Sequence, residues 1–175
     1  MNNIQDEDEK SVGDFKLLKD MNINAIKIYH SRSRKGYTKG EFNKALLKEL
    51  YEKYGIYVIM GDFFGAYTIG SNADWEKGTD YTDPKQRELM KESVRKMVLD
   101  HKDEPYILMW VLGNENDVGL DYKGVNATRT NASKYPEAYF TFLEEVVQMI
   151  HELDPDHPVC AVNLTNCLLY TSDAA

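Results

Sequence analysis

The strongest constraint on the fold is an alternation of short apolar segments with amphipathic helices. Four segments are rich in β-branched and other apolar side chains, and one stretch of helical periodicity separates each from the next. These segments are residues 24–29, 56–60, 107–112 and 158–162. Strands that are apolar throughout are typical of parallel sheets whose faces are both covered. The sequence therefore predicts an α/β fold.

The best-marked helix lies between the second and third predicted strands. Asp83 is suited to cap its first turn, and Pro84 suits the first helical position. Apolar residues at helical spacing follow, and Pro105 ends the helix. Similar periodicity predicts helices over residues 11–20, 41–54 and 137–153.

Two architectures are compatible with this alternation, a doubly wound sheet and a (β/α)8 barrel. No strand is followed by the Gly-x-Gly-x-x-Gly turn that opens a dinucleotide-binding helix, which disfavours the first. Residues 61–82 and 113–136 form long polar stretches after strands, whereas the connections after helices are short. Barrel enzymes build their active sites from the loops that follow strands, so this asymmetry favours the barrel.

Composition excludes several other classes of protein. The formal net charge is -8, and Lys and Arg are mixed with acidic residues, so we expect no nucleic-acid partner. No apolar run approaches the roughly 20 residues needed to span a bilayer, and we expect no membrane partner. Residues 1–10 are polar and acidic, unlike a signal peptide. The sequence contains no convincing metal-binding cluster and no cofactor motif, so we expect neither group.

The last nine positions, residues 167–175, read Cys-Leu-Leu-Tyr-Thr-Ser-Asp-Ala-Ala. They resemble the translation of a transposase adapter used to prepare sequencing libraries. On this hypothesis the natural sequence is visible only to about Asn166, and residues 167–175 carry no functional information. The alternative is a genuine short apolar segment, and recovery of the same codons from genomic DNA would establish it.

A carboxylate follows the third predicted strand. Gly113, Asn114 and Glu115 come directly after a buried segment that contains Trp110. Catalytic groups in barrel enzymes lie at the carboxyl ends of strands, and glycine lets the backbone turn there. Glu115 is therefore the leading catalytic candidate, against the alternatives of a solvated loop acid for Glu115 and a turn residue for Asn114.

Three segments resemble, in order, the second, third and fourth strands of the barrel domain of glycoside hydrolase family 2, the β-galactosidase and β-glucuronidase family. They are residues 24–30, 50–59 and 107–115. The resemblance extends over residues 11–166 and implies a partial (β/α)8 barrel containing about strands 2 to 5. It also implies that Glu115 is the general acid/base, that Asn114 binds the sugar 2-hydroxyl, and that His30 lies in the substrate pocket. For His30 the alternative is a structural hydrogen-bonding residue at the end of a strand.

The sequence departs from the family pattern at two places. Met60-Gly61-Asp62-Phe63 stands where the family usually carries Asp-Glu-Ala-Asn, and Lys27 stands for the usual Arg. Asp62 is a candidate for binding a sugar hydroxyl, with capping of its own loop as the alternative. Trp110 is predicted to lie in the substrate site beside Glu115. Either burial beside Trp110 or closeness to the anionic nucleophile would disfavour the ionised form of the Glu115 carboxyl group.

Aromatic residues in the two long loops have two possible roles, stacking on sugar faces or packing the loops themselves. They are Tyr67, Trp75, Tyr81 and Tyr122.

The resemblance implies a retaining glycosidase, which needs two carboxyl groups about 5–5.5 Å apart. The nucleophile of this clan follows the seventh strand, so we expect it outside this chain. The predicted function is hydrolysis of O-glycosidic bonds, with an oligosaccharide or β-glycoside as substrate. Two alternatives stay open, a carbohydrate-binding barrel without catalytic activity and a transglycosylase of related fold.

Overall fold

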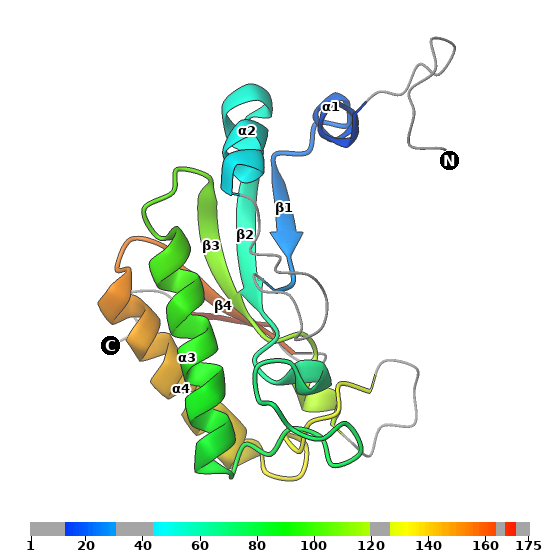
Figure 1. Cartoon of the computed structure of the whole chain (residues 1–175), viewed down its shortest axis with the longest axis vertical. Helices are drawn as coiled ribbons and strands as arrows, with labels where there is room; N and C mark the ends of the chain where they lie inside the picture. The colour runs from blue at the N-terminus through cyan, green and yellow to red at the C-terminus, as the bar shows by residue number, and fades with distance from the viewer. Residues whose placement is uncertain (1–12, 31–43, 120–126, 164–166, 171–175) are drawn as a thin grey trace.

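One sheet organises the chain. The computed structural model describes residues 13–30, 44–119, 127–163 and 167–170, and its strands follow the order β1-β2-β3-β4-β5 (Figure 1). Strands β1 to β4 are parallel, and β5 pairs with β4 in the antiparallel direction. The strands are β1 (Ala25–Ile28), β2 (Tyr57–Asp62), β3 (Ile107–Leu112), β4 (Val159–Val162) and β5 (Cys167–Tyr170). The predicted α/β class is confirmed.

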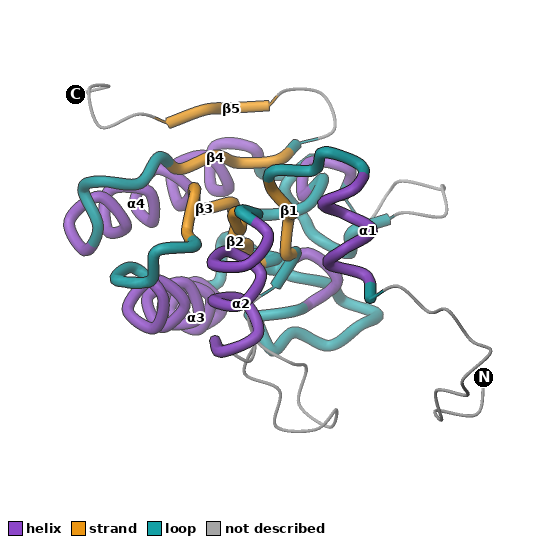
Figure 2. Tube along the Cα trace, turned by 90° about the horizontal axis from the view of Figure 1, so that it is seen from above, coloured by secondary structure: helices purple, strands orange, loops and turns teal. Residues whose placement is uncertain are grey.

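Among the described residues, one α-helix precedes β1 and one α-helix lies between each two successive parallel strands. The α-helices are α1 (Asp14–Asp20), α2 (Lys44–Tyr54), α3 (Pro84–His101) and α4 (Pro136–Leu153), and short 3-10 turns are η1 (Ala66–Thr68) and η2 (Asn116–Val118). Helices α3 and α4 lie side by side against the sheet, as Figures 1 and 2 show from two directions. The predicted start of α3 is confirmed, because the Asp83 side chain accepts a hydrogen bond from the Lys85 N–H at 2.8 Å and Pro84 occupies the first turn.

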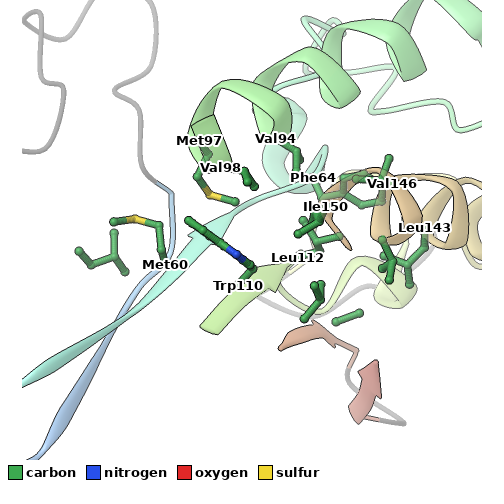
Figure 3. Close-up of a cluster of buried hydrophobic side chains, with 14 of the residues drawn as sticks. Met60, Phe64, Val94, Met97, Val98, Trp110, Leu112, Leu143, Val146 and Ile150 are labelled. Atoms are coloured by element: carbon green, nitrogen blue, oxygen red, sulfur yellow. The ribbon is translucent and has the colours of Figure 1, made fainter. Parts of the chain in front are cut away.

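The two faces of the parallel sheet differ in burial. Ile28, Met60, Trp110 and Val159 are paired across all four parallel strands, and each is at most 8% exposed. Because neighbours in a ladder share a face, this row lies on the side covered by helices. Figure 3 shows the labelled members Met60 and Trp110 beside Met97 and Val98 of α3. The main core therefore lies between the sheet and the helical layer.

The opposite face carries one half-buried row among the described residues. The adjacent row pairs Lys27, Ile59 and Met109, and all three are half-buried. Side chains alternate between faces along a strand, so this row points away from α3 and α4.

Strand β2 is longer than the sequence predicted. It continues through Gly61 and Asp62, which the glycine-rich composition had suggested belong to the following loop. Asp62 pairs with Leu112 and thereby shares the face of Met60, two positions earlier. The direction of the Asp62 side chain follows from this extension.

Strand β5 occupies the edge beside β4. Its antiparallel direction departs from the parallel order of the other strands. The backbone pairing does not test whether residues 167–175 derive from an adapter, so that assignment stays a prediction. Among the described residues, no helix is long and apolar enough to cross a membrane.

A buried polar cluster stabilises the amino end of β4. The Trp110 indole N–H donates to Asp154 at 2.8 Å, and Asp154 also lies 2.8 Å from His157 Nδ1. Asp154 is only 4% exposed, so its carboxylate needs these partners.

Replacement of Asp154 by alanine should destabilise the domain. The change leaves the Trp110 N–H buried without its acceptor, which costs about 1–3 kcal/mol. The free energy of unfolding, measured from the urea transition of the domain, should fall by that amount. Exposed Asp156→Ala is the matched control, and equal transitions for both variants would contradict the role of the cluster.

Candidate active site

The carboxyl ends of the four parallel strands meet at one edge of the sheet. Two long connections lie at this edge, after β2 and after β3, at the lower end of the sheet in Figure 1. His30 follows β1, Asp62 ends β2, and Asn114 and Glu115 follow β3. The parallel order thus gathers these side chains from different parts of the sequence.

Glu115 occupies a tight turn after β3. Its φ of 56° and ψ of 38° place it in the left-handed region, which is uncommon for a residue with a side chain. Its N–H donates to the carbonyl of Val162 at 2.9 Å, and its carbonyl accepts from Thr128 Oγ1 at 3.1 Å. The side chain is half-buried. Backbone contacts from two segments therefore hold Glu115 at the edge in a strained conformation.

The neighbouring Asn116 side chain joins the two long loops. Its Oδ1 accepts from the backbone N–H of Asn114 at 2.7 Å. Its Nδ2 donates to the Phe64 carbonyl at 2.8 Å and to the Tyr81 hydroxyl at 2.7 Å. Asn116 is fully buried, so these bonds form away from water. The turn that carries Glu115 is consequently fixed to the loop after β2.

Gly113 makes this arrangement possible. It has a φ of 77°, and a Cβ atom at this position would lie 2.8 Å from Asn116 Oδ1. Both the backbone conformation and the space therefore require glycine here.

The Tyr81 hydroxyl completes a hydrogen-bonded cross-link between the two long loops. It donates to the Phe64 carbonyl at 2.7 Å while accepting from Asn116. Burial raises the pKa of Tyr81 well above that of a free tyrosine, so the hydroxyl keeps its proton. Tyr81 thus packs the loop and does not offer a face for a sugar.

Backbone contacts add to the connection between the loops. Thr79 and Thr130 form a parallel bridge, and the Tyr67 N–H donates to the Thr128 carbonyl at 2.6 Å. Thr130 Oγ1 donates to the Asn116 carbonyl at 2.6 Å. The two loops therefore act as one packed unit around Glu115.

His30 and Asn114 each contact an aromatic residue of the loop after β2. The Phe63 N–H donates to His30 Nδ1 at 3.2 Å, and the two rings are stacked with centroids 5.5 Å apart. Asn114 Nδ2 donates to the Tyr67 hydroxyl at 3.3 Å, and the Tyr67 ring meets Phe63 edge-on. Contacts through Phe63 and Tyr67 thus connect His30 with Asn114.

The Asp62 side chain caps the loop that follows β2. Its Oδ1 accepts from the Phe64 N–H at 2.8 Å, and its Oδ2 accepts from Ser93 Oγ of α3 at 2.7 Å. Asp62 is fully buried on the helix-covered face of the sheet. Both carboxylate oxygens are occupied, so the contacts favour a structural role over binding of a sugar hydroxyl.

Trp110 is not brought to this edge. It is fully buried in the core, and its indole N–H donates to Asp154 near the opposite end of the strands. Its place in the ladder directs the ring toward α3, as Figure 3 shows. The structure therefore places the Trp110 ring in the core against α3.

The other loop aromatics differ in exposure. Trp75 is 43% exposed, and the guanidinium of Arg129 lies over its ring at 5.3 Å from the centroid. Arg129 also donates to the Trp75 carbonyl, which ties the ring to the neighbouring loop. Tyr122 lies outside the described residues.

Sequence reasoning did not identify Asn116 or Thr128 as supports of the site. The available signal for Asn116 was a short amide side chain within an irregular turn, where backbone groups need partners outside regular structure. Thr128 carried no comparable signal, because its contact with Glu115 joins positions separated by 13 residues.

One family model matches most of the chain. The family model described as "Glycosyl hydrolases family 2, TIM barrel domain" matches residues 6–170. A β-galactosidase of Lactococcus lactis subsp. lactis is 28% identical over 118 residues, which span 67% of this chain and 10% of that protein. The chain thus spans about a tenth of the length of this curated relative.

Solved structures of β-glucuronidases have a similar fold. The enzyme of Dictyoglomus thermophilum matches with a TM-score of 0.56 and 22% identity, over 85% of this chain and 21% of that one. A Bifidobacterium dentium β-glucuronidase complexed with coumarin-3-O-glucuronide matches with a TM-score of 0.54 and 21% identity, over 86% and 20%. The four parallel strands with their helices are accordingly part of a (β/α)8 barrel.

Replacement of Asn116 by alanine should disturb both stability and the site. It leaves the Asn114 N–H without its side-chain acceptor and removes one of the two side-chain donors to the Phe64 carbonyl, which costs about 2 kcal/mol. The urea midpoint should fall, and Asn24→Ala, a change at an exposed asparagine, should leave it unchanged. A loss below about 0.5 kcal/mol, the range of ordinary surface substitutions, would contradict the cross-link.

Proposed function

Because this chain belongs to glycosyl hydrolase family 2, we propose that its protein is a retaining glycoside hydrolase acting on β-glycosides, with Glu115 as general acid/base. The observation that carries the proposal is the placement of Glu115. It follows β3 at the carboxyl edge of the parallel sheet, in a left-handed turn held by Val162 and Thr128. Strained residues that the surrounding structure holds in place are typical of active sites.

In the proposed reaction Glu115 acts twice. As an acid it protonates the leaving glycosidic oxygen while a second carboxylate attacks the anomeric carbon. As a base it then removes a proton from the water that hydrolyses the glycosyl-enzyme intermediate. We propose that the second carboxylate follows the seventh barrel strand, outside this chain, about 5–5.5 Å from Glu115.

Asn114 and His30 are the proposed substrate contacts of this half of the site. Asn114 precedes the acid/base, and its amide is held at the edge by Tyr67. His30 Nδ1 accepts from the Phe63 N–H and lies 3.5 Å from Asp62 Oδ2, so Nε2 is the ring nitrogen proposed to meet a sugar hydroxyl. Two similar proteins support a β-linked sugar as the substrate. One relative is named a β-galactosidase, and one similar structure holds a coumarin glucuronide.

Replacement of Glu115 by alanine tests the acid/base role. In the full-length protein, kcat/KM for β-glycosides with poor leaving groups should fall about 10²–10⁴-fold, because these need protonation in the transition state. Activated aryl glycosides should lose far less in the glycosylation step. Azide should restore part of their turnover, since it attacks the intermediate without a general base.

The control is Glu152→Ala, at an exposed carboxylate of α4, which should match the wild type. Undiminished hydrolysis of poor leaving groups by Glu115→Ala would refute the assignment.

A further inference from the structure

We infer that Tyr67 is a positioning residue, whose hydroxyl holds the Asn114 amide in place for the sugar 2-hydroxyl. The inference rests on the proposed function and adds to it a residue from the loop after β2. Tyr67 Oη accepts from Asn114 Nδ2 at 3.3 Å, and both side chains are half-buried.

Asn114 needs such a partner because it lies outside regular structure. Its backbone N–H is fixed by Asn116 Oδ1 at 2.7 Å, but its side chain extends from a turn. A side-chain amide without a neighbour samples several rotamers, and fixing it costs conformational entropy when a sugar binds. The Tyr67 hydroxyl removes part of this cost before the substrate arrives.

Tyr67 is itself firmly held. Its ring meets Phe63 edge-on, with centroids 5.6 Å apart and planes at 89°. Its backbone is left-handed, with φ of 56° and ψ of 28°, and Thr68 follows with φ of 60°. Such conformations persist only when surrounding contacts enforce them, and they concentrate at functional sites.

The backbone of Tyr67 also reaches the support of Glu115. Its N–H donates to the Thr128 carbonyl at 2.6 Å, and Thr128 Oγ1 donates to the Glu115 carbonyl at 3.1 Å. Tyr67 thus contacts Asn114 through its hydroxyl and is linked to Glu115 through Thr128. The strained turn at η1 therefore places the Tyr67 hydroxyl beside the Asn114 amide.

Direct stacking of the ring on a sugar is the competing role for Tyr67. Tyr67→Phe separates the two roles, because it keeps the ring and removes only the hydroxyl. A stacking role predicts no change in this variant. A positioning role through Asn114 predicts a loss that depends on the 2-hydroxyl of the substrate.

The experiment measures kcat/KM of the full-length protein and of Tyr67→Phe, Asn114→Ala and the double variant. The substrates are 4-nitrophenyl β-D-galactopyranoside, 4-nitrophenyl β-D-glucuronide and the 2-deoxy analogue of the one cleaved faster. Tyr67→Phe should lower kcat/KM about 3- to 10-fold on the 2-hydroxy substrate, the range of one hydrogen bond, and less than about twofold on the 2-deoxy analogue.

The double variant should be no slower than Asn114→Ala alone, because the two changes remove one shared interaction. Tyr135→Phe, at an exposed tyrosine before α4, is the control for loss of a phenol and should match the wild type.

Equal losses on both substrates, or no loss on either, would overturn the inference while activity still depends on Glu115. Activity independent of Glu115 would overturn the proposed function, and the inference with it. The two failures are therefore distinguished by the same set of proteins.

Discussion

The fully buried Asn116 side chain is the interaction on which the geometry of the site depends. Through one amide group it joins the Asn114 backbone to the Phe64 carbonyl and the Tyr81 hydroxyl, across two loops separated by helix α3. Buried hydrogen bonds of this kind are costly to leave unmade, so the loops pack in one arrangement. Glu115 lies between Asn114 and Asn116 in the chain, and the bond from the Asn116 side chain to the Asn114 N–H fixes the turn that carries its strained conformation.

The fold places this cross-link at the proposed active site. Parallel pairing puts the ends of β1 to β4 at one edge, and the helical layer buries the row that contains Met60 and Trp110. The Trp110–Asp154 contact stabilises the opposite end of the strands, away from the loops. Barrel proteins commonly divide the two ends in this way, with stability at the amino end and chemistry at the carboxyl end.

Periodicity and end signals predicted the elements of the fold well. The apolar run of β3 and the cap formed by Asp83 are local features, so the sequence alone was sufficient for both. Side-chain direction was harder to predict, since it depends on where a strand ends. Strand β2 continues two residues beyond its predicted end, and this extension directs the Asp62 side chain toward Ser93. The position of Trp110 in the ladder directs its ring toward α3. The residues that support the turn at Glu115 lie far apart in the sequence. No local pattern predicts the hydrogen bond between Asn116 and Tyr81 or the one between Tyr67 and Asn114.

In the proposed function, the edge that carries Glu115 belongs to a retaining glycosidase. Proton NMR of the first sugar released from a β-glycoside by the full-length protein tests it most directly, because the anomeric signals separate the two stereochemical outcomes before mutarotation. Double displacement with a carboxylate nucleophile near Glu115 predicts that the β-anomer forms first. Initial formation of the α-anomer would contradict the account.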